Sequence, residues 1–243
     1  MSVLFYTHIR KTAGTSVRRS VFDPHITESK RHRPNGYRAA IAAQGPFDLV
    51  QGHFPYGLHH FYGTSNPRYF VMLRRPVDRA VSFYYFVEAC SGPSYTHPRL
   101  EEVRKNSLTE FYENPIHQNV QTRFVAGLLS DYAGRYLSLN GSLGRAVLRR
   151  AKQNLIEQYE AFGLKERFKD SVWLFANRLD VTPEWPEKRH KKTGERPAVS
   201  DLDEHVRRTV RQYNSLDVEL YRFARKQFGQ QAAHLNPETG VMS

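Results

Sequence analysis

The chain alternates short apolar runs with longer stretches in which apolar residues recur every three or four positions. The short runs are rich in β-branched and aromatic residues and occupy residues 2–9, 47–51, 69–73 and 161–164. Continuous apolar runs of this length are typical of parallel strands that are buried on both faces. The pattern therefore predicts an α/β fold of three layers, in which helices flank a central, mainly parallel sheet.

The longer stretches predict the helices of this fold. Pro76 follows the third apolar run and suits the first turn of a helix, and Asp78 places a negative charge where it favours the helix dipole. In the last stretch the apolar residues Leu216, Leu220 and Phe223 repeat at intervals of three and four. The predicted helices span residues 17–22, 76–87, 108–112, 119–129, 143–159, 166–179, 203–213 and 216–228.

Turn-forming residues mark the connections and the limits of the fold. Polar segments with Pro or Gly at residues 27–38, 91–98 and 180–200 predict loops, and the last is long enough to suggest a functional role. A chain of 243 residues suits one α/β core, so we expect a single domain over residues 1–229. Residues 230–243 are then a flexible C-terminal tail.

Charge and cysteine content restrict the class of partner and the compartment. Lys and Arg total 36 against 24 Asp and Glu, a net charge of +12 that favours a phosphorylated cofactor, an acidic glycan or nucleic acid without choosing among them. Cys90 is the only cysteine, which excludes an intrachain disulfide. No run approaches the roughly 18 apolar residues of a membrane span, and residues 1–10 are patterned as a strand rather than a signal peptide. We therefore expect a cytoplasmic protein without membrane association.

The first apolar run leads directly into a loop with the composition of an anion-binding site. Its residues are Arg10, Lys11, Thr12, Ala13, Gly14, Thr15 and Ser16. A strand, a tight loop and a helix direct several backbone N–H groups to one point, to which Lys11 adds a full charge and the three hydroxyl residues add donors. Gly14 is expected to let the backbone approach the anion. The triphosphate signature GxxxxGK[ST] is absent because the lysine precedes the glycine, so we expect a nucleotide without ordinary triphosphate chemistry.

The same segment carries a resemblance to a known family. Residues 8–16 read HIRKTAGTS and resemble the 5'-phosphosulfate loop of sulfotransferases that use 3'-phosphoadenosine 5'-phosphosulfate (PAPS). The resemblance is in particular to the carbohydrate branch that includes heparan sulfate 2-O-sulfotransferase, whose loop reads approximately HIPKTAGTS, so that Arg10 replaces a proline. It extends over residues 2–228 and implies a P-loop-like fold. The implied reaction moves a sulfuryl group from PAPS to an acceptor hydroxyl on a carbohydrate and releases 3'-phosphoadenosine 5'-phosphate (PAP).

A second motif agrees with the first. Residues 71–85 read VMLRRPVDRAVSFYY and are similar to the strand and helix with which that family binds the 3'-phosphate. Arg74 leaves the strand tip and Ser82 lies about two turns into the helix, so both can reach one phosphate. Arg75 replaces the family's usual aspartate, which leaves open which of the two arginines holds the phosphate.

The resemblance also implies a catalytic histidine. His53, in the segment QGHFPYG, occupies the place of that residue and is the candidate general base. Imidazole has a reference pKa of about 6.5, so it can accept the hydroxyl proton of the acceptor near neutrality. His59 and His60 are the local rivals. The second catalytic candidate is Lys11, which would stabilise the negative charge that grows on the departing phosphate.

Two later segments resemble the family more weakly. Lys192 and Thr193 resemble a late loop that closes over the 3'-phosphate. Arg123, in the segment NVQTR, resembles an acceptor-binding position, and helix packing remains an equal alternative. No convincing metal-ligand cluster is present, so no metal is expected.

Two other classes of function are weighed against this interpretation. A nucleotide-dependent kinase could use the first loop on ATP, but the missing Walker lysine and the second anion site at Arg74 and Ser82 argue against it. A non-catalytic module that binds polyanions or nucleic acid would account for the net charge, but not for two ordered motifs. We therefore expect a hydroxyl acceptor rather than nucleic acid as the partner.

Overall fold

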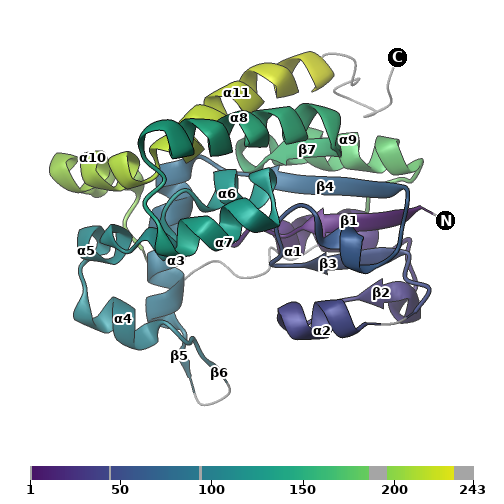
Figure 1. Ribbon diagram of the computed structural model, residues 1–243, viewed down its shortest axis with the longest axis horizontal. Helices are drawn as coiled ribbons and strands as arrows, with labels where there is room; N and C mark the ends of the chain where they lie inside the picture. Colours follow the sequence, from purple (N-terminus) through teal and green to yellow (C-terminus); the bar gives the residue numbers. More distant parts are fainter. Residues whose placement is uncertain (1, 44, 93–94, 186–195, 233–243) are drawn as a thin grey trace.

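A fully parallel sheet of five strands forms the centre of the molecule, in the order β2–β3–β1–β4–β7 (Figure 1). The computed structural model describes residues 2–43, 45–92, 95–185 and 196–232. The strands are β1 (Val3–Thr7), β2 (Arg31–His32), β3 (Leu49–Gly52), β4 (Pro67–Leu73) and β7 (Tyr159–Leu164). The predicted α/β fold with a central parallel sheet flanked by helices is confirmed.

The central strands are apolar because layers of side chains cover both of their faces. Phe70, Val71 and Met72 of β4 are completely buried. Phe5 of β1 stacks on Tyr69 of β4, with ring centroids 4.9 Å apart. Burying one such side chain contributes about 1.5–3 kcal/mol to stability. The sheet is therefore a rigid base for the loops that leave its strands.

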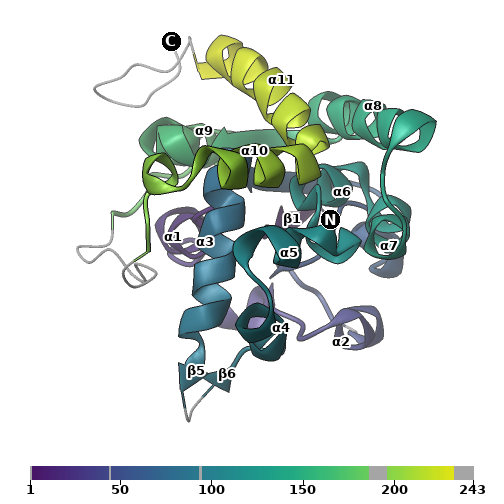
Figure 2. The same ribbon diagram turned by 90° about the vertical axis from the view of Figure 1, so that its left-hand side faces the viewer.

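Helices cover the two faces of the sheet (Figure 2). On one side lie α1 (Gly14–Val17) and α9 (Phe168–Leu179), and α9 packs on the π-helical turn η1 (Arg18–Phe22) that continues α1. On the other side lie α6 (Val120–Ala126), α7 (Leu128–Tyr136) and α8 (Gly141–Glu157). The last helix, α11 (Ser215–Ala232), packs on α8 and α6. The three expected layers are present.

A second group of helices lies beyond the carboxyl ends of the strands (Figure 1). It consists of α3 (Pro76–Ala89), α4 (Leu100–Lys105), α5 (Leu108–Glu113) and α10 (Glu204–Tyr213), with a small hairpin of β5 (Ser91–Gly92) and β6 (Tyr95–Thr96). These helices share a hydrophobic cluster of their own that includes Val81, Phe111 and Val210. They form a wall facing the ends of β1, β3 and β4.

The strands match their predicted positions better than the connections do. Each of the four predicted strands occurs, but the predicted loop at 27–38 contains the edge strand β2 and the start of α2 (Tyr37–Ala42). The predicted loop at 91–98 contains the β5–β6 hairpin, and α4 was not predicted. These elements are two to six residues long, too short for a hydrophobic period to reveal them.

The predicted helix over 119–129 is divided at Gly127. The backbone of Gly127 has φ 116°, a conformation that a helix cannot contain. A distant residue causes the break, because the Tyr56 N–H donates to the Phe124 carbonyl and the Tyr56 carbonyl accepts from the Leu128 N–H. The result is two helices, α6 and α7, that meet at an angle beside the cleft described below.

The last helix extends past the predicted domain boundary. Residues 230–232, assigned from the sequence to the tail, belong to α11. Residues 233–243 lie outside the described part of the chain, so their flexibility stays a prediction. Within the described residues no helix has both the length and the apolar character needed to cross a membrane.

Candidate active site

The loops that follow β1, β3 and β4 meet at one edge of the sheet. The register pairs Thr7 at the end of β1 with Gly52 of β3 and with Val71 of β4. Because β1 lies between β3 and β4, the strand order reverses here, and open α/β sheets bind their ligands at such a point. A cleft of about 1650 Å³ opens at this edge. Small-ligand pockets typically measure roughly 300–1,000 Å³, so the cleft has room for a donor and an acceptor together.

The loop after β1 is held closed from within. Lys11 and Ala13 adopt left-handed backbone conformations with φ 68° and 69°. Between them the buried Thr12 hydroxyl donates to the Ile9 carbonyl oxygen at 2.8 Å. The sequence suggested Thr12 as a donor to the anion, whereas the structure uses its hydroxyl to stabilise the loop.

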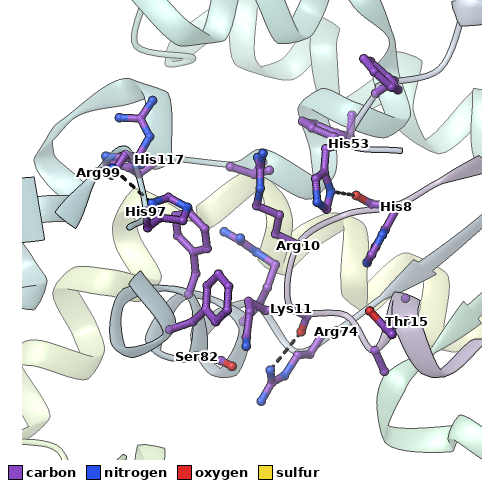
Figure 3. Close-up of a pocket in the computed structure, with 18 of the residues that line it drawn as sticks. His8, Arg10, Lys11, Thr15, His53, Arg74, Ser82, His97, Arg99 and His117 are labelled. Carbon is purple, nitrogen blue, oxygen red and sulfur yellow. Dashed lines mark hydrogen bonds between the residues drawn. The ribbon is translucent and has the colours of Figure 1, made fainter. Parts of the chain in front are cut away.

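The remaining loop residues turn their side chains or backbone to the cleft. Those that line it are Arg10, Lys11, Ala13, Gly14, Thr15 and Ser16. The Lys11 ammonium lies 4.2 Å from the centre of the Phe86 ring on α3. Lys11 therefore spans the gap between the loop and the helical wall (Figure 3).

His8 and His53 lie together at one end of the cleft (Figure 3). The ring centroids are 4.6 Å apart, and His53 Nδ1 lies 2.6 Å from the carbonyl oxygen of His8. The His8 ring covers Gly14, where any Cβ atom would overlap it. Gly14 is therefore needed to admit the His8 side chain, a different reason from the anion approach that the sequence suggested.

The contact with the His8 carbonyl determines which nitrogen of His53 carries a hydrogen. A carbonyl oxygen only accepts, so Nδ1 is the donor and Nε2 of the neutral ring keeps its lone pair. Desolvation, and then the charge of Arg10, lowers the pKa of His53 to about 3. The ring is therefore neutral at pH 7 with a free lone pair on Nε2, and burial makes this nitrogen a weaker base than the free imidazole on which the sequence prediction relied.

The two rival histidines lie outside the residues that line the cleft. The His59 backbone N–H donates to the Tyr69 hydroxyl at 3.0 Å, and its Nδ1 lies 3.0 Å from the same oxygen. The His60 ring packs against His59 with centroids 4.0 Å apart. Of the three candidates for the base, His53 is the one that faces the cleft.

Arg74 and Ser82 face the same cleft as Lys11, Arg74 from the end of β4 and Ser82 from α3 (Figure 3). Their exposed fractions are 5% and 3%. Arg74 Nη1 donates to the Lys11 carbonyl oxygen at 3.0 Å, which joins the two loops. The Gln121 side chain fixes the backbone of Arg74, accepting from its N–H at 2.9 Å and donating to its carbonyl at 3.0 Å.

Arg75 is not among the residues that line the cleft. It is exposed, and its backbone N–H donates to Glu166 at 3.1 Å. Burial, and then the charge of Arg196, lowers the pKa of Arg74 to about 10, so its guanidinium still carries a positive charge at pH 7. Of the two adjacent arginines, Arg74 is the one beside the cleft.

The model of the sulfotransferase family matches residues 2–224. The chain belongs to the sulfotransferase family. The matched region of this sulfotransferase includes the Lys11 loop, His53, Arg74 and Ser82.

The similar proteins are distant in sequence. Heparan-sulfate 6-O-sulfotransferase 3 of Mus musculus is 26% identical over 189 residues, covering 70% of this chain and 40% of the mouse protein. Heparan sulfate 2-O-sulfotransferase hst-2 of Caenorhabditis elegans is 25% identical over 134 residues, covering 55% of this chain and 40% of the other. The chain thus spans less than half the length of these relatives. A crystal structure of a sulfotransferase from Alicyclobacillus acidocaldarius matches 91% of this chain and 95% of that one, with a TM-score of 0.44 and 16% identity.

Arg123 of this sulfotransferase lines the cleft, but its guanidinium is largely occupied. Nη1 donates to the carbonyls of Pro115 and Gly134 at 2.9 and 2.7 Å. Nη2 donates to the Ile116 carbonyl at 3.2 Å and to Asp131 at 3.1 Å. These contacts favour the packing role of Arg123, which ties α6 to α7, and acceptor binding by this residue stays a prediction.

The cleft contains cations that the sequence did not single out. They are Arg79, Arg99, Arg135, Lys165 and Arg196. One signal was available for Arg79, which lies three residues before Ser82 and so shares its helix face.

Lys192 and Thr193 lie outside the described residues. Among the described residues no group of three or more His, Cys, Asp and Glu side chains could hold a metal ion.

Acidification is expected to destabilise the protein through its cleft histidines. Desolvation lowers the pKa of His8 to about 4 and that of His53 to about 3, whereas the unfolded chain titrates near 6.5. Between these values the unfolded state binds more protons, so the free energy of unfolding falls as the pH drops, by at most about 1.4 kcal/mol per pH unit for each histidine. Urea denaturation between pH 7 and pH 5 measures this fall. In the variant His53→Asn the slope should be shallower, and an unchanged slope would contradict the titration assigned to His53.

Proposed function

We propose that this chain transfers a sulfuryl group from PAPS to a hydroxyl of an acidic carbohydrate. One observation carries the proposal: Lys11, Arg74 and Ser82, which come from two different loops of the sheet edge, line a single cleft. Two anion-binding regions in one cleft suit a nucleotide that carries phosphate groups on both the 3' and the 5' positions of its ribose. Membership of the sulfotransferase family supports the same donor.

The residues present fit such a donor. Arg74 Nε is buried and has no hydrogen-bond partner among the described residues, so it is available to an acceptor in the cleft. Arg74 would hold the 3'-phosphate by a charge-assisted fork and Ser82 by its hydroxyl. The Lys11 ammonium and the hydroxyls of Thr15 and Ser16 would hold the 5'-phosphosulfate. Lys192 and Thr193 remain expected partners of the 3'-phosphate.

His53 would act on the acceptor. Its Nε2 takes the hydroxyl proton while the acceptor oxygen forms a bond to sulfur. The bond between sulfur and the 5'-phosphate oxygen breaks with its electron pair, so negative charge grows on that oxygen. Lys11 stabilises this charge with its ammonium group. The Nδ1–H bond to the His8 carbonyl keeps the His53 ring oriented throughout.

The other half of the cleft suits an acceptor with negative charges. Arg10 projects between His53 and the wall that carries His97 and Arg99 (Figure 3). Desolvation, and then the positive charge of Arg99, lowers the pKa of Arg10. Arg135 lines the same region, held by two bonds to Asp131 at 2.9 and 2.6 Å. Such a group of arginines favours carboxylate or sulfate substituents near the reacting hydroxyl.

Transfer of labelled sulfate from PAPS tests the proposal. The acceptors are a polysaccharide of uronic acid and hexosamine, a neutral glucan and a phenol. We expect transfer to the acidic polysaccharide to exceed that to the other two by about tenfold or more, the factor that corresponds to a difference of 1.4 kcal/mol.

A thermal shift series controls for the donor. PAP should raise the melting temperature, and ATP with magnesium should raise it far less. Equal stabilisation by ATP, with no transfer from PAPS to any acceptor, would contradict the proposed donor. Transfer that favours the glucan or the phenol would contradict the acidic acceptor alone.

A further inference from the structure

Arg79 is a buried cation that the chemistry above does not use. It lies in the second turn of α3, lines the cleft and is only 1% exposed. Its Nε and Nη2 atoms are buried and have no hydrogen-bond partner among the described residues. A guanidinium has five N–H donors, and burying them unpaired is costly.

The described protein supplies no anion for this charge. Arg79 forms no ion pair with the residues that the structure describes. The Tyr112 hydroxyl accepts a hydrogen bond from the Arg79 side chain and donates to the Ala80 carbonyl at 2.9 Å. A neutral phenol cannot compensate a buried charge, and a buried charge is otherwise paired. The position therefore calls for a bound anion.

The neighbours of Arg79 indicate where this anion lies. Residues three apart on a helix share a face, and Arg79, Ser82 and Phe86 all line the cleft. Arg79 is close enough to Arg74 for its charge to help lower the pKa of Arg74, after burial and the larger effect of Arg196. Two buried arginines with unpaired nitrogen atoms and one hydroxyl thus line the same cleft, from the end of β4 and from α3.

We propose that Arg79 binds the 3'-phosphate of the donor together with Arg74 and Ser82, and so makes the enzyme select a nucleotide that carries this phosphate. The inference rests on the proposed donor. It adds a third group to the two that the sequence suggested, and it gives a physical reason for a charge buried without a partner. Two guanidinium groups can neutralise a phosphate of charge near −2, which one cannot.

Calorimetric titration with two nucleotides tests the role of Arg79. PAP carries the 3'-phosphate and adenosine 5'-phosphate lacks it. For Arg79→Lys we expect the Kd of PAP to rise about 10-fold, because lysine keeps the charge but not the guanidinium fork. For Arg79→Gln we expect it to rise about 100-fold, because the charge-assisted contact is lost. The Kd of adenosine 5'-phosphate should change less than threefold in both. Arg75→Gln, which removes the exposed neighbouring charge, is the matched control and should bind both nucleotides as the wild type does.

The outcomes separate the inference from the proposed function. If wild-type protein does not prefer PAP over adenosine 5'-phosphate, the proposed donor fails. If it does, and the Arg79 variants keep this preference or weaken both nucleotides equally, Arg79 is structural and the inference fails. A crystal structure of the wild type with PAP decides the matter even if both variants misfold. It should place the Arg79 guanidinium within hydrogen-bond distance of a 3'-phosphate oxygen, and a separation beyond 4 Å overturns the inference.

Discussion

Replacing His53 by asparagine is expected to lower the rate of sulfuryl transfer by about 10²–10⁴-fold, the usual contribution of a general base. The asparagine amide can still donate to the His8 carbonyl, so the loop keeps its contact while the basic Nε2 atom is lost. Steady-state kinetics with PAPS and the acidic acceptor measure the change in kcat. The Kd of PAP should stay within threefold of the wild-type value.

The rival histidines provide the matched controls for this substitution. His59→Asn removes a ring that contacts the Tyr69 hydroxyl, and His60→Asn removes the ring packed against it. Both lie away from the cleft, so both variants should keep wild-type kcat. If transfer survived in His53→Asn and disappeared in His59→Asn, the base would be His59 and not His53.

Replacing Lys11 by alanine is expected to lower kcat by about 10²–10³-fold, the effect of removing one preorganised group that stabilises developing negative charge. Lys11 extends from the loop after β1 to the Phe86 ring, where its ammonium lies 4.2 Å from the ring centre. The measurement is a single-turnover rate at saturating PAPS, so that weaker binding does not mask the chemical step.

The control for Lys11→Ala is a lysine of equal charge on the outer surface. Lys105 is exposed at the end of α4 and lies outside the residues that line the cleft. Lys105→Ala should keep the wild-type rate. If Lys11→Ala raised the KM of PAPS without changing the single-turnover rate, Lys11 would contribute to binding and not to the transfer step.

The candidate site was largely predictable because it is built at strand ends. Lys11, His53 and Arg74 each follow a buried apolar run, and the carboxyl ends of parallel strands share one edge of the sheet. Short apolar runs and a few motif residues are therefore enough to bring these side chains into one cleft. Ser82 follows from the helix that Pro76 begins.

The rest of the site depends on packing that the sequence does not display. Arg79 lies in a predicted helix, but a helical arginine can face solvent, core or cleft until the neighbouring helices are placed. Arg135 falls outside the predicted helices, although it lies in α7. The contacts of Thr12 with the Ile9 carbonyl and of Gly14 with the His8 ring were also not visible in the sequence. The break at Gly127 likewise arises from a residue distant in sequence, Tyr56.

The central claim is that the loops carrying Lys11 and Arg74 form one site for one doubly phosphorylated adenosine. Calorimetric titration of the full chain with PAP tests it most directly, repeated with Lys11→Ala and with Arg74→Gln. We expect one molecule of PAP to bind per chain, and each variant to bind it more weakly. Two independent sites, or a PAP affinity that neither substitution changes, would contradict it.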